Sequence, residues 1–355
     1  MDYQHLIAWG AFLGFVLLML ALDLFVLHRN PHVISFKEAL VGALVPVTVA
    51  IAFIGVIYYA YEHKVLSLGV IPPEILHSPG ARFWPTNGGD AAVLFLTGYL
   101  VELSLSADNV FLFVVLMSFF RVPRALQHRV LFWGVLGALV MRGVMIAAGS
   151  VLLTRFHWLI YVFGAFLVFT GGRMLFADAR EPDPSQSLPI RLARKVLPLH
   201  PDFDGNRFFT RVNGKRLATS LLLVLICIEF TDLVFALDSI PAIFGITHDT
   251  FIVFTSNVFA ILGLRSMYFL LAGVMNKFSY LKYGLAVVLG FVGVKMLLPL
   301  AGMLFGQLSG GGNYDWEFNK FLSLGVILGT LLASVLASLA FPKKAATVPN
   351  PLENA

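Results

Sequence analysis

The chain has 355 residues, of which 58% are hydrophobic and 13% are charged, and its formal net charge is +5. About a quarter of the residues of a soluble domain are charged, so this composition excludes an ordinary soluble protein and predicts one that crosses a membrane several times. We interpret the positive charges through the positive-inside rule, with membrane lipids rather than nucleic acid as partners.

Nine apolar runs are long enough to cross a bilayer, which takes about 20 residues of helix. They cover residues 6–27, 38–60, 91–119, 130–153, 157–177, 217–243, 251–274, 281–300 and 321–341. The first run has no basic stretch before it and no clear cleavage site after it, so we expect a retained helix rather than a signal peptide. The predicted fold class is all-α, a polytopic transmembrane helix bundle.

Basic residues are distributed unevenly between the two sides of these spans. The connections after spans one, three, five and seven, together with the C-terminal tail, hold 17 Lys and Arg when Lys282 at the edge of span eight is included, and the N-terminus and the other connections hold 4. This asymmetry predicts an N-terminus outside the cell and a cytoplasmic C-terminus. The longest cytoplasmic connection, 178–216, is rich in Pro and charge, and its Asn213-Gly214 pair predicts a small hairpin.

An internal repeat relates three successive spans to three later ones. The stretch "ELSLSADN" (102–109) matches "DLVFALDS" (232–239), and the next two spans match in the same order, with Arg142 opposite Arg265 and Arg173 opposite Lys295. Because three is odd, the second copy must run through the membrane in the opposite direction. Two inverted three-helix repeats are typical of secondary transporters.

The repeat divides the chain into five parts. These are two N-terminal spans with an outer loop (1–90), the first repeat (91–177), the linker (178–216), the second, inverted repeat (217–300), and a last part with an outer loop, the final span and the tail (301–355).

Besides Glu38, which is the first residue of its span, six acidic residues lie within spans. They are Asp23, Glu102, Asp108, Glu229, Asp232 and Asp238. One Asp at the centre of a membrane helix costs roughly 2.5–3.5 kcal/mol, so these side chains must be protonated, paired with a base, or bound to a cation. The plain interpretation is that Arg142 and Arg265 pair with two of them as structural contacts. We favour a cation site for the last five, because they outnumber these two bases.

The candidate ligands are hard oxygen atoms. Besides the carboxylates of Glu102, Asp108, Glu229, Asp232 and Asp238, we expect help from Asn109, Ser239 and Asn257. Oxygen ligands suit Mg²⁺, Ca²⁺ or Mn²⁺. Serine hydroxyls that bond backbone carbonyls, and a proline that cannot donate a hydrogen bond, predict interruptions of both acidic helices near Ser104, Ser106 and Pro241. Arg142 and Arg265 are expected to point into the bundle and to pair with the acids or gate the empty site.

The residues also carry a family resemblance. The stretches "GYLVELSLSADNVF", "IEFTDLVFALDSIPAIF", "FTSNVFAILGLRSMYFLLAG" and "LKYGLAVVLGFVGVKML" resemble the TerC family of integral membrane proteins, over nearly the whole chain. The resemblance implies export of Mn²⁺, as a transported ion and not a cofactor, from a bacterial cell through its inner (plasma) membrane. It places the family's acidic membrane residues on Glu102, Asp108, Glu229, Asp232 and Asp238.

Two other classes of function stay open from the sequence. An intramembrane enzyme is disfavoured, because the chain has no H-E-x-x-H, no G-x-S-x-G and a single cysteine, Cys227. A membrane component of a tellurium or metal stress response that does not itself transport is the main alternative. The oligomeric state and the coupling ion stay open as well.

Overall fold

The computed structural model describes residues 3–22, 36–71, 81–176, 198, 200, 202–212, 214–271, 280–309 and 319–340. For a few of these, Asp108 among them, it describes the backbone alone. Asp23, another of the acids predicted within a span, lies outside the described residues.

The described part of the chain is helical apart from one small hairpin. The helices are α1 (Tyr3–Leu22), α2 (Phe36–Glu62), α4 (Gly88–Phe119), α5 (Arg124–Arg155), α6 (Leu159–Phe176), α8 (Ser220–Phe244), α9 (Thr250–Leu262), α10 (Leu264–Leu271), α11 (Leu281–Ser309) and α12 (Lys320–Ala340), with short 3₁₀ turns η2 (Val65–Ser67) and η3 (Ala81–Phe83). Within the described residues, nine segments are long and apolar enough to span a membrane, α9 and α10 counting as one. The predicted all-α transmembrane bundle is therefore confirmed.

The structure corrects where the helices are interrupted. The acidic helices α4 and α8 run without a break through Ser104, Ser106 and Pro241. Ser104 donates from Oγ to the carbonyl of Leu100 at 2.7 Å, a bond that an intact helix accommodates. The interruption lies instead at Gly263, between α9 and α10. Glycine weakens a helix because it gives up more backbone freedom on folding than other residues do.

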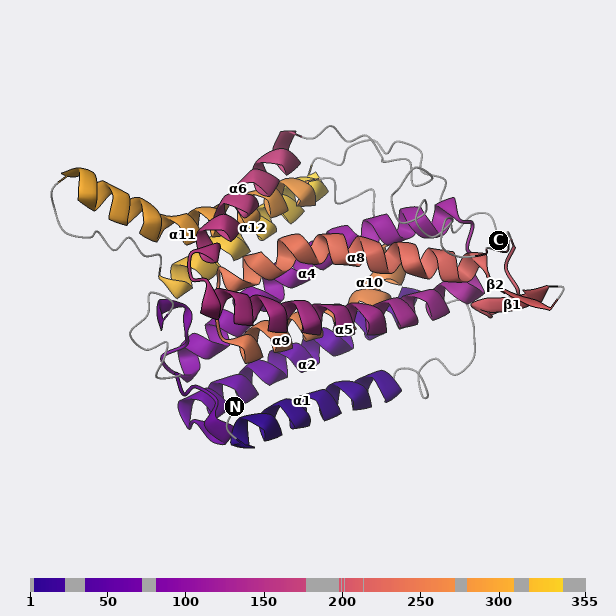
Figure 1. Ribbon diagram of the computed structural model, residues 1–355, viewed down its shortest axis with the longest axis horizontal. Coiled ribbons are helices and arrows are strands. Elements are labelled where there is room, and N and C mark those ends of the chain that lie inside the picture. Colours follow the sequence, from indigo (N-terminus) through magenta and orange to yellow (C-terminus); the bar gives the residue numbers. More distant parts are fainter. Residues whose placement is uncertain are drawn as a thin grey trace.

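The helices form two groups in the bundle (Figure 1). In the larger group α4 packs against α2, α8 and α9, and α5 packs against α8 and α9. In the smaller group α6 packs along α11, which also contacts α12. The α6–α11 contact brings backbones together: a methyl group on Gly171 would lie 2.7 Å from the carbonyl oxygen of Ala286. Small residues allow such close packing of membrane helices.

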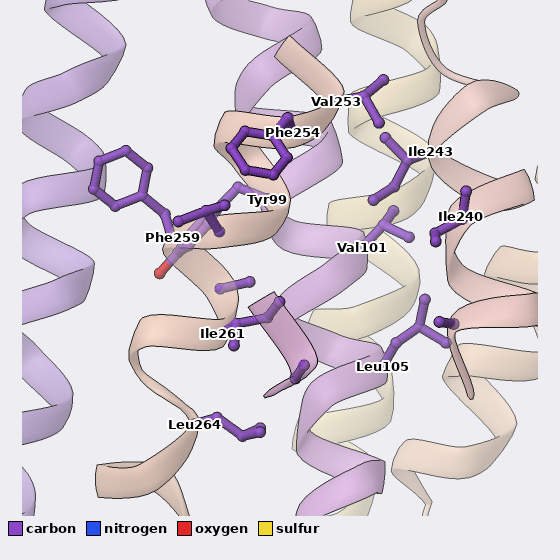
Figure 2. Packing of buried hydrophobic residues seen from close by; sticks show 14 of the residues in the cluster. Tyr99, Val101, Leu105, Ile240, Ile243, Val253, Phe254, Phe259, Ile261 and Leu264 are labelled. Atoms are coloured by element: carbon purple, nitrogen blue, oxygen red, sulfur yellow. The ribbon is translucent and has the colours of Figure 1, made fainter. Parts of the chain in front are cut away.

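Apolar side chains fill the space between α4, α8 and α9 (Figure 2). Val101 on α4 lies near Ile240 and Ile243 on α8, and Phe254 and Phe259 project from α9. These residues belong to one buried cluster that extends through the larger group of helices. The polar residues described below are thus enclosed by packed hydrocarbon, where an unpaired charge is costly.

The two ends of the bundle differ in chemistry. At the end that carries the N-terminus, the N-terminal end, Lys320 of α12 forms an ion pair with Asp90 of α4 at 2.7 Å. Asp249 caps α9 there by accepting hydrogen bonds from the amides of Phe251 and Ile252 at 3.0 and 3.2 Å, and from the hydroxyl of Tyr61 at 2.9 Å. Burial raises the pKa of the Asp249 carboxyl, although these hydrogen bonds oppose the shift.

The opposite end, which we call the hairpin end, carries the predicted hairpin. Strand β1 (Phe209–Val212) pairs antiparallel with β2 (Lys215–Ala218), and Gly214 in the turn has a φ of 76°. The hairpin leads directly into α8. The predicted hairpin is confirmed, while Asn213 in its turn lies outside the described residues.

Candidate cation site

A buried arginine joins two buried carboxylates near the middle of the bundle. Arg142 of α5 donates to Asp232 of α8 through Nη2 to Oδ1 at 2.9 Å and through Nε to Oδ2 at 3.1 Å. Its Nη1 also forms an ion pair with Oε1 of Glu102 on α4. Arg142 is 2% exposed, Glu102 0% and Asp232 1%. Two consecutive helices, α4 and α5, thus meet the more distant α8 at one charge cluster.

Two neutral side chains complete this cluster. Asn257 of α9 accepts from Arg142 Nη1 at 3.3 Å and donates from Nδ2 to Glu102 Oε2 at 3.1 Å. Ser106, one turn along α4, donates to Glu102 Oε1 at 3.3 Å, because residues four apart share a face of a helix. The sequence predicted that Ser106 loosens its helix, whereas in the structure it supports a carboxylate. We call Glu102, Ser106, Arg142, Asp232 and Asn257 the central cluster.

The central cluster carries more negative than positive charge. Two carboxylates face one guanidinium, so the formal excess is one negative charge. Glu229 lies one turn from Asp232 on α8 and is half-buried, so negative charge on both acids at once is unfavourable. With Glu229 beside the buried Arg142–Asp232 pair, the site holds more carboxylates than bases. An additional cation that reaches this site is therefore bound favourably.

A missing side chain on α5 makes room for Glu229. A methyl group on Gly137 would overlap the carboxylate of Glu229. Gly137 therefore lets this carboxylate approach the backbone of α5, on the same stretch of α5 that carries Arg142. Sequence reasoning missed Gly137, because a glycine in an apolar span gives no sign of what packs against it.

Asp238 lies apart from the central cluster. It is six residues beyond Asp232, which corresponds to about 9 Å along a helix axis. Its Oδ1 accepts from Thr170 Oγ1 of α6 at 3.3 Å, and its charge is attracted by Arg173. Thr170 was not among the predicted site residues. The only sequence signal close to it was Arg173, which the predicted repeat aligns with Lys295.

Two of the predicted auxiliary residues have buried polar atoms that form no hydrogen bond with the described residues. Asn109 on α4 is 2% exposed and Ser239 on α8 is 1% exposed, and the atoms concerned are Nδ2 and Oγ. Each lies seven residues from a carboxylate of the central cluster, so Asn109 shares a helix face with Glu102, and Ser239 shares one with Asp232. The side chain of Asp108, next to Asn109, lies outside the described residues.

Arg265, the counterpart of Arg142 in the predicted repeat, is buried on α10 at 5% exposure. It borders a small, mostly apolar cavity whose wall includes Asp232, Phe113 and Gly134. Both predicted basic residues are therefore buried within the bundle, and Arg142 bridges the two central carboxylates. Among the described residues, no three His, Cys, Asp or Glu side chains come close enough to hold a metal ion together.

Comparisons with known proteins agree with a membrane bundle of this kind. The family model "Integral membrane protein TerC family" matches residues 87–346. An uncharacterized membrane protein of Myxococcus xanthus is 47% identical over 96% of this chain and 94% of its own length. A protein of Escherichia coli (strain K12) named "Putative membrane-bound redox modulator Alx" is 46% identical over 84% of this chain and 91% of its own length. No solved structure matches. The chain belongs to the TerC family of integral membrane proteins.

Proposed function

We propose that the chain transports a divalent cation, Mn²⁺, out of the cytoplasm, with Glu102 and Asp232 as its central ligands. The observation that carries this proposal is that two fully buried carboxylates from different helices are held by one guanidinium. Removing two carboxylates from water is costly, and this arrangement gives the protein a binding place for positive charge deep within its apolar core. The family resemblance of the sequence supplies manganese as the ion.

The atoms around the two carboxylates favour a hard cation. Asn257 offers an amide oxygen and Ser106 a hydroxyl oxygen next to Glu102. Glu229 adds a third carboxylate one turn from Asp232. Carboxylate, amide and hydroxyl oxygens are the ligands that Mn²⁺ and Mg²⁺ prefer, whereas Zn²⁺ and Cu⁺ prefer sites with nitrogen or sulfur.

Arg142 gives this site an occupant when the ion is absent. Its guanidinium bonds both carboxylates that we assign to the ion, so the ion and the guanidinium exclude one another. An incoming divalent cation replaces one positive charge by two and removes the negative excess of the central cluster. Without Arg142, the empty carboxylates would need protons to stay buried. Exchange of Mn²⁺ for protons is thus compatible with the site but not required by it.

The remaining predicted ligands extend the path on both sides. Helix α4 runs toward the hairpin end and α8 runs toward the N-terminal end. Asp108 and Asn109 therefore lie on the hairpin side of Glu102, and Asp238 and Ser239 lie on the N-terminal side of Asp232. We propose that these residues bind the ion before and after the central cluster. On the N-terminal side this is supported by Ser239 Oγ, a buried oxygen that has no hydrogen-bond partner among the described residues. The positive-inside bias makes the hairpin end the cytoplasmic one.

Transport by purified protein tests the proposal and separates it from a stress-response component that does not transport. The full chain is placed in liposomes that contain a Mn²⁺-quenched dye, and quenching is followed after Mn²⁺ is added outside. We expect flux from the unaltered chain, and at least a tenfold loss in Glu102→Gln and in Asp232→Asn. Asp202→Asn, an exposed acid near the hairpin, is the matched control and should transport normally.

Each outcome has a distinct meaning. Liposomes with the unaltered chain that take up Mn²⁺ no faster than empty liposomes would rule out transport and favour the alternative. Flux that persists in both carboxylate variants, with normal behaviour on gel filtration, would instead remove the central cluster from the transport path.

A further inference from the structure

The β1–β2 hairpin stands where a membrane-spanning helix leaves the bilayer. Phe208, just before β1, packs edge-on against Trp133 of α5, with ring centroids 6.4 Å apart. Trp133 is 44% exposed on a helix that spans the membrane, so its free face meets lipid. Tryptophan is enriched at the level of the lipid headgroups. The base of the hairpin therefore lies at the edge of the bilayer on the hairpin end.

The hairpin concentrates positive charge at this level. Arg211 and Arg216 are directly opposite one another across the two strands, and both are exposed, as is Lys215 beside them. Like charges in opposite positions destabilise a strand pair. No ion pair between an acidic residue and either arginine is found in the described residues, and Arg216 lies over the ring of Phe209 at 4.1 Å. An anion at this position would relieve the repulsion.

A third arginine adds a hydrogen-bond donor that the described residues leave unused. The guanidinium of Arg129, one turn before Trp133 on α5, lies 5.1 Å from the ring centre of Phe208. Its Nε is buried and has no hydrogen-bond partner among the described residues. A buried N–H is normally paired, and Arg129 forms no ion pair with the described residues either, so they leave the charge of its guanidinium uncompensated. Asp204, an acid close to the hairpin in sequence, forms its ion pair with Arg207 at 3.8 Å.

We propose that Arg129 and the β1–β2 hairpin together bind the phosphate of an anionic phospholipid headgroup in the leaflet at the hairpin end. Arg129 and Arg216 contact the phosphate oxygens, while Phe208 and Trp133 lie beside the start of the acyl chains. Lipid is the source of the phosphate because Trp133 places the cluster at the bilayer and because Phe209, also exposed, would lie against it. The site is independent of the proposed transport of Mn²⁺.

Lipid binding to the purified full chain tests this site. The chain in detergent is titrated with phosphatidylglycerol or phosphatidylcholine, and bound lipid is counted by native mass spectrometry. We expect phosphatidylglycerol to bind more tightly, and the double variant Arg129→Gln/Arg216→Gln to bind it roughly 30-fold more weakly, which equals about 2 kcal/mol or about 1 kcal/mol for each basic residue. The control Lys64→Gln/Arg155→Gln loses the same charge from exposed positions near the other end and should bind normally.

A second measurement leaves Arg129 and Arg216 in place and so does not depend on the folding of the double variant. Brominated lipids quench tryptophan, and the quenching lost in Trp133→Phe reports on Trp133 alone. Brominated phosphatidylglycerol should quench this fluorescence more than brominated phosphatidylcholine at equal mole fraction. Equal quenching, equal affinity for the two lipids, or an unchanged affinity of the double variant would each overturn the proposal. Displacement of the lipid by an equal concentration of soluble glycerol phosphate would overturn it too, because the site would then bind free phosphate.

Discussion

Replacing Arg142 by Gln separates an arginine that substitutes for an ion from one that is a permanent structural contact. The change keeps a polar side chain but leaves the carboxylates of Glu102 and Asp232 buried without their cation. Removing one partner of a buried ion pair costs about 3–5 kcal/mol. We therefore expect Arg142→Gln to unfold at a clearly lower temperature than the unaltered chain when no divalent ion is present.

The same change should strengthen the binding of Mn²⁺. In the unaltered chain the ion must displace a guanidinium that makes three hydrogen bonds to the two carboxylates. If each contributes roughly 0.5–1.5 kcal/mol net, their loss is equivalent to about a tenfold to a thousandfold change in affinity. Arg142→Gln should thus bind Mn²⁺ at least ten times more tightly, and Mn²⁺ should raise its unfolding temperature more than that of the unaltered chain.

Two measurements check this expectation: Mn²⁺ binding by titration calorimetry, and thermal unfolding with and without Mn²⁺. Arg142→Lys is the matched control, since it keeps the charge and should not gain affinity. If Arg142→Gln is destabilised but binds Mn²⁺ no better than the unaltered chain, Arg142 is a structural contact, and the idea that it takes the place of the ion is wrong.

Two further predictions concern neighbouring features. The methyl group of Gly137→Ala displaces the flexible end of Glu229 and not the backbone. Mn²⁺ flux in liposomes should therefore fall about tenfold while the unfolding temperature barely changes. The control is Gly172→Ala on α6, where a methyl group meets nothing within 4 Å, and it should leave both the flux and the unfolding temperature unchanged. Asp249→Ala removes the cap of α9 and the hydrogen-bond partner of Tyr61. This change should lower the free energy of unfolding by about 1–2 kcal/mol without abolishing Mn²⁺ binding. A thermal midpoint equal to that of the unaltered chain would contradict this prediction.

The number and position of the spans could be predicted from the sequence, because a membrane helix needs about 20 apolar residues and few charges. The break at Gly263 could not be, since glycine is tolerated within membrane helices as often as it ends them. The residues that meet at the central cluster were named in advance, but their grouping was not. Helices that are apolar on every side give no sign of which face is buried, so only packing places Asp232 with Arg142 and Asp238 with Thr170.

The inverted repeat itself stays a prediction, although the helix contacts fit it. If α4 corresponds to α8 and α5 to α9–α10, a half-turn converts the contact of α4 with α9 into that of α8 with α5, and both contacts are present. The arginines break this symmetry, because Arg142 bridges the central carboxylates while Arg265 borders the cavity beside them. A carrier that alternates between two related states would exchange these positions. Each arginine would then take the place of the ion in one of the two states, so Arg142→Gln and Arg265→Gln should both lower Mn²⁺ flux. Arg265→Gln should destabilise this ion-free state less, and normal flux in Arg265→Gln would exclude the exchange.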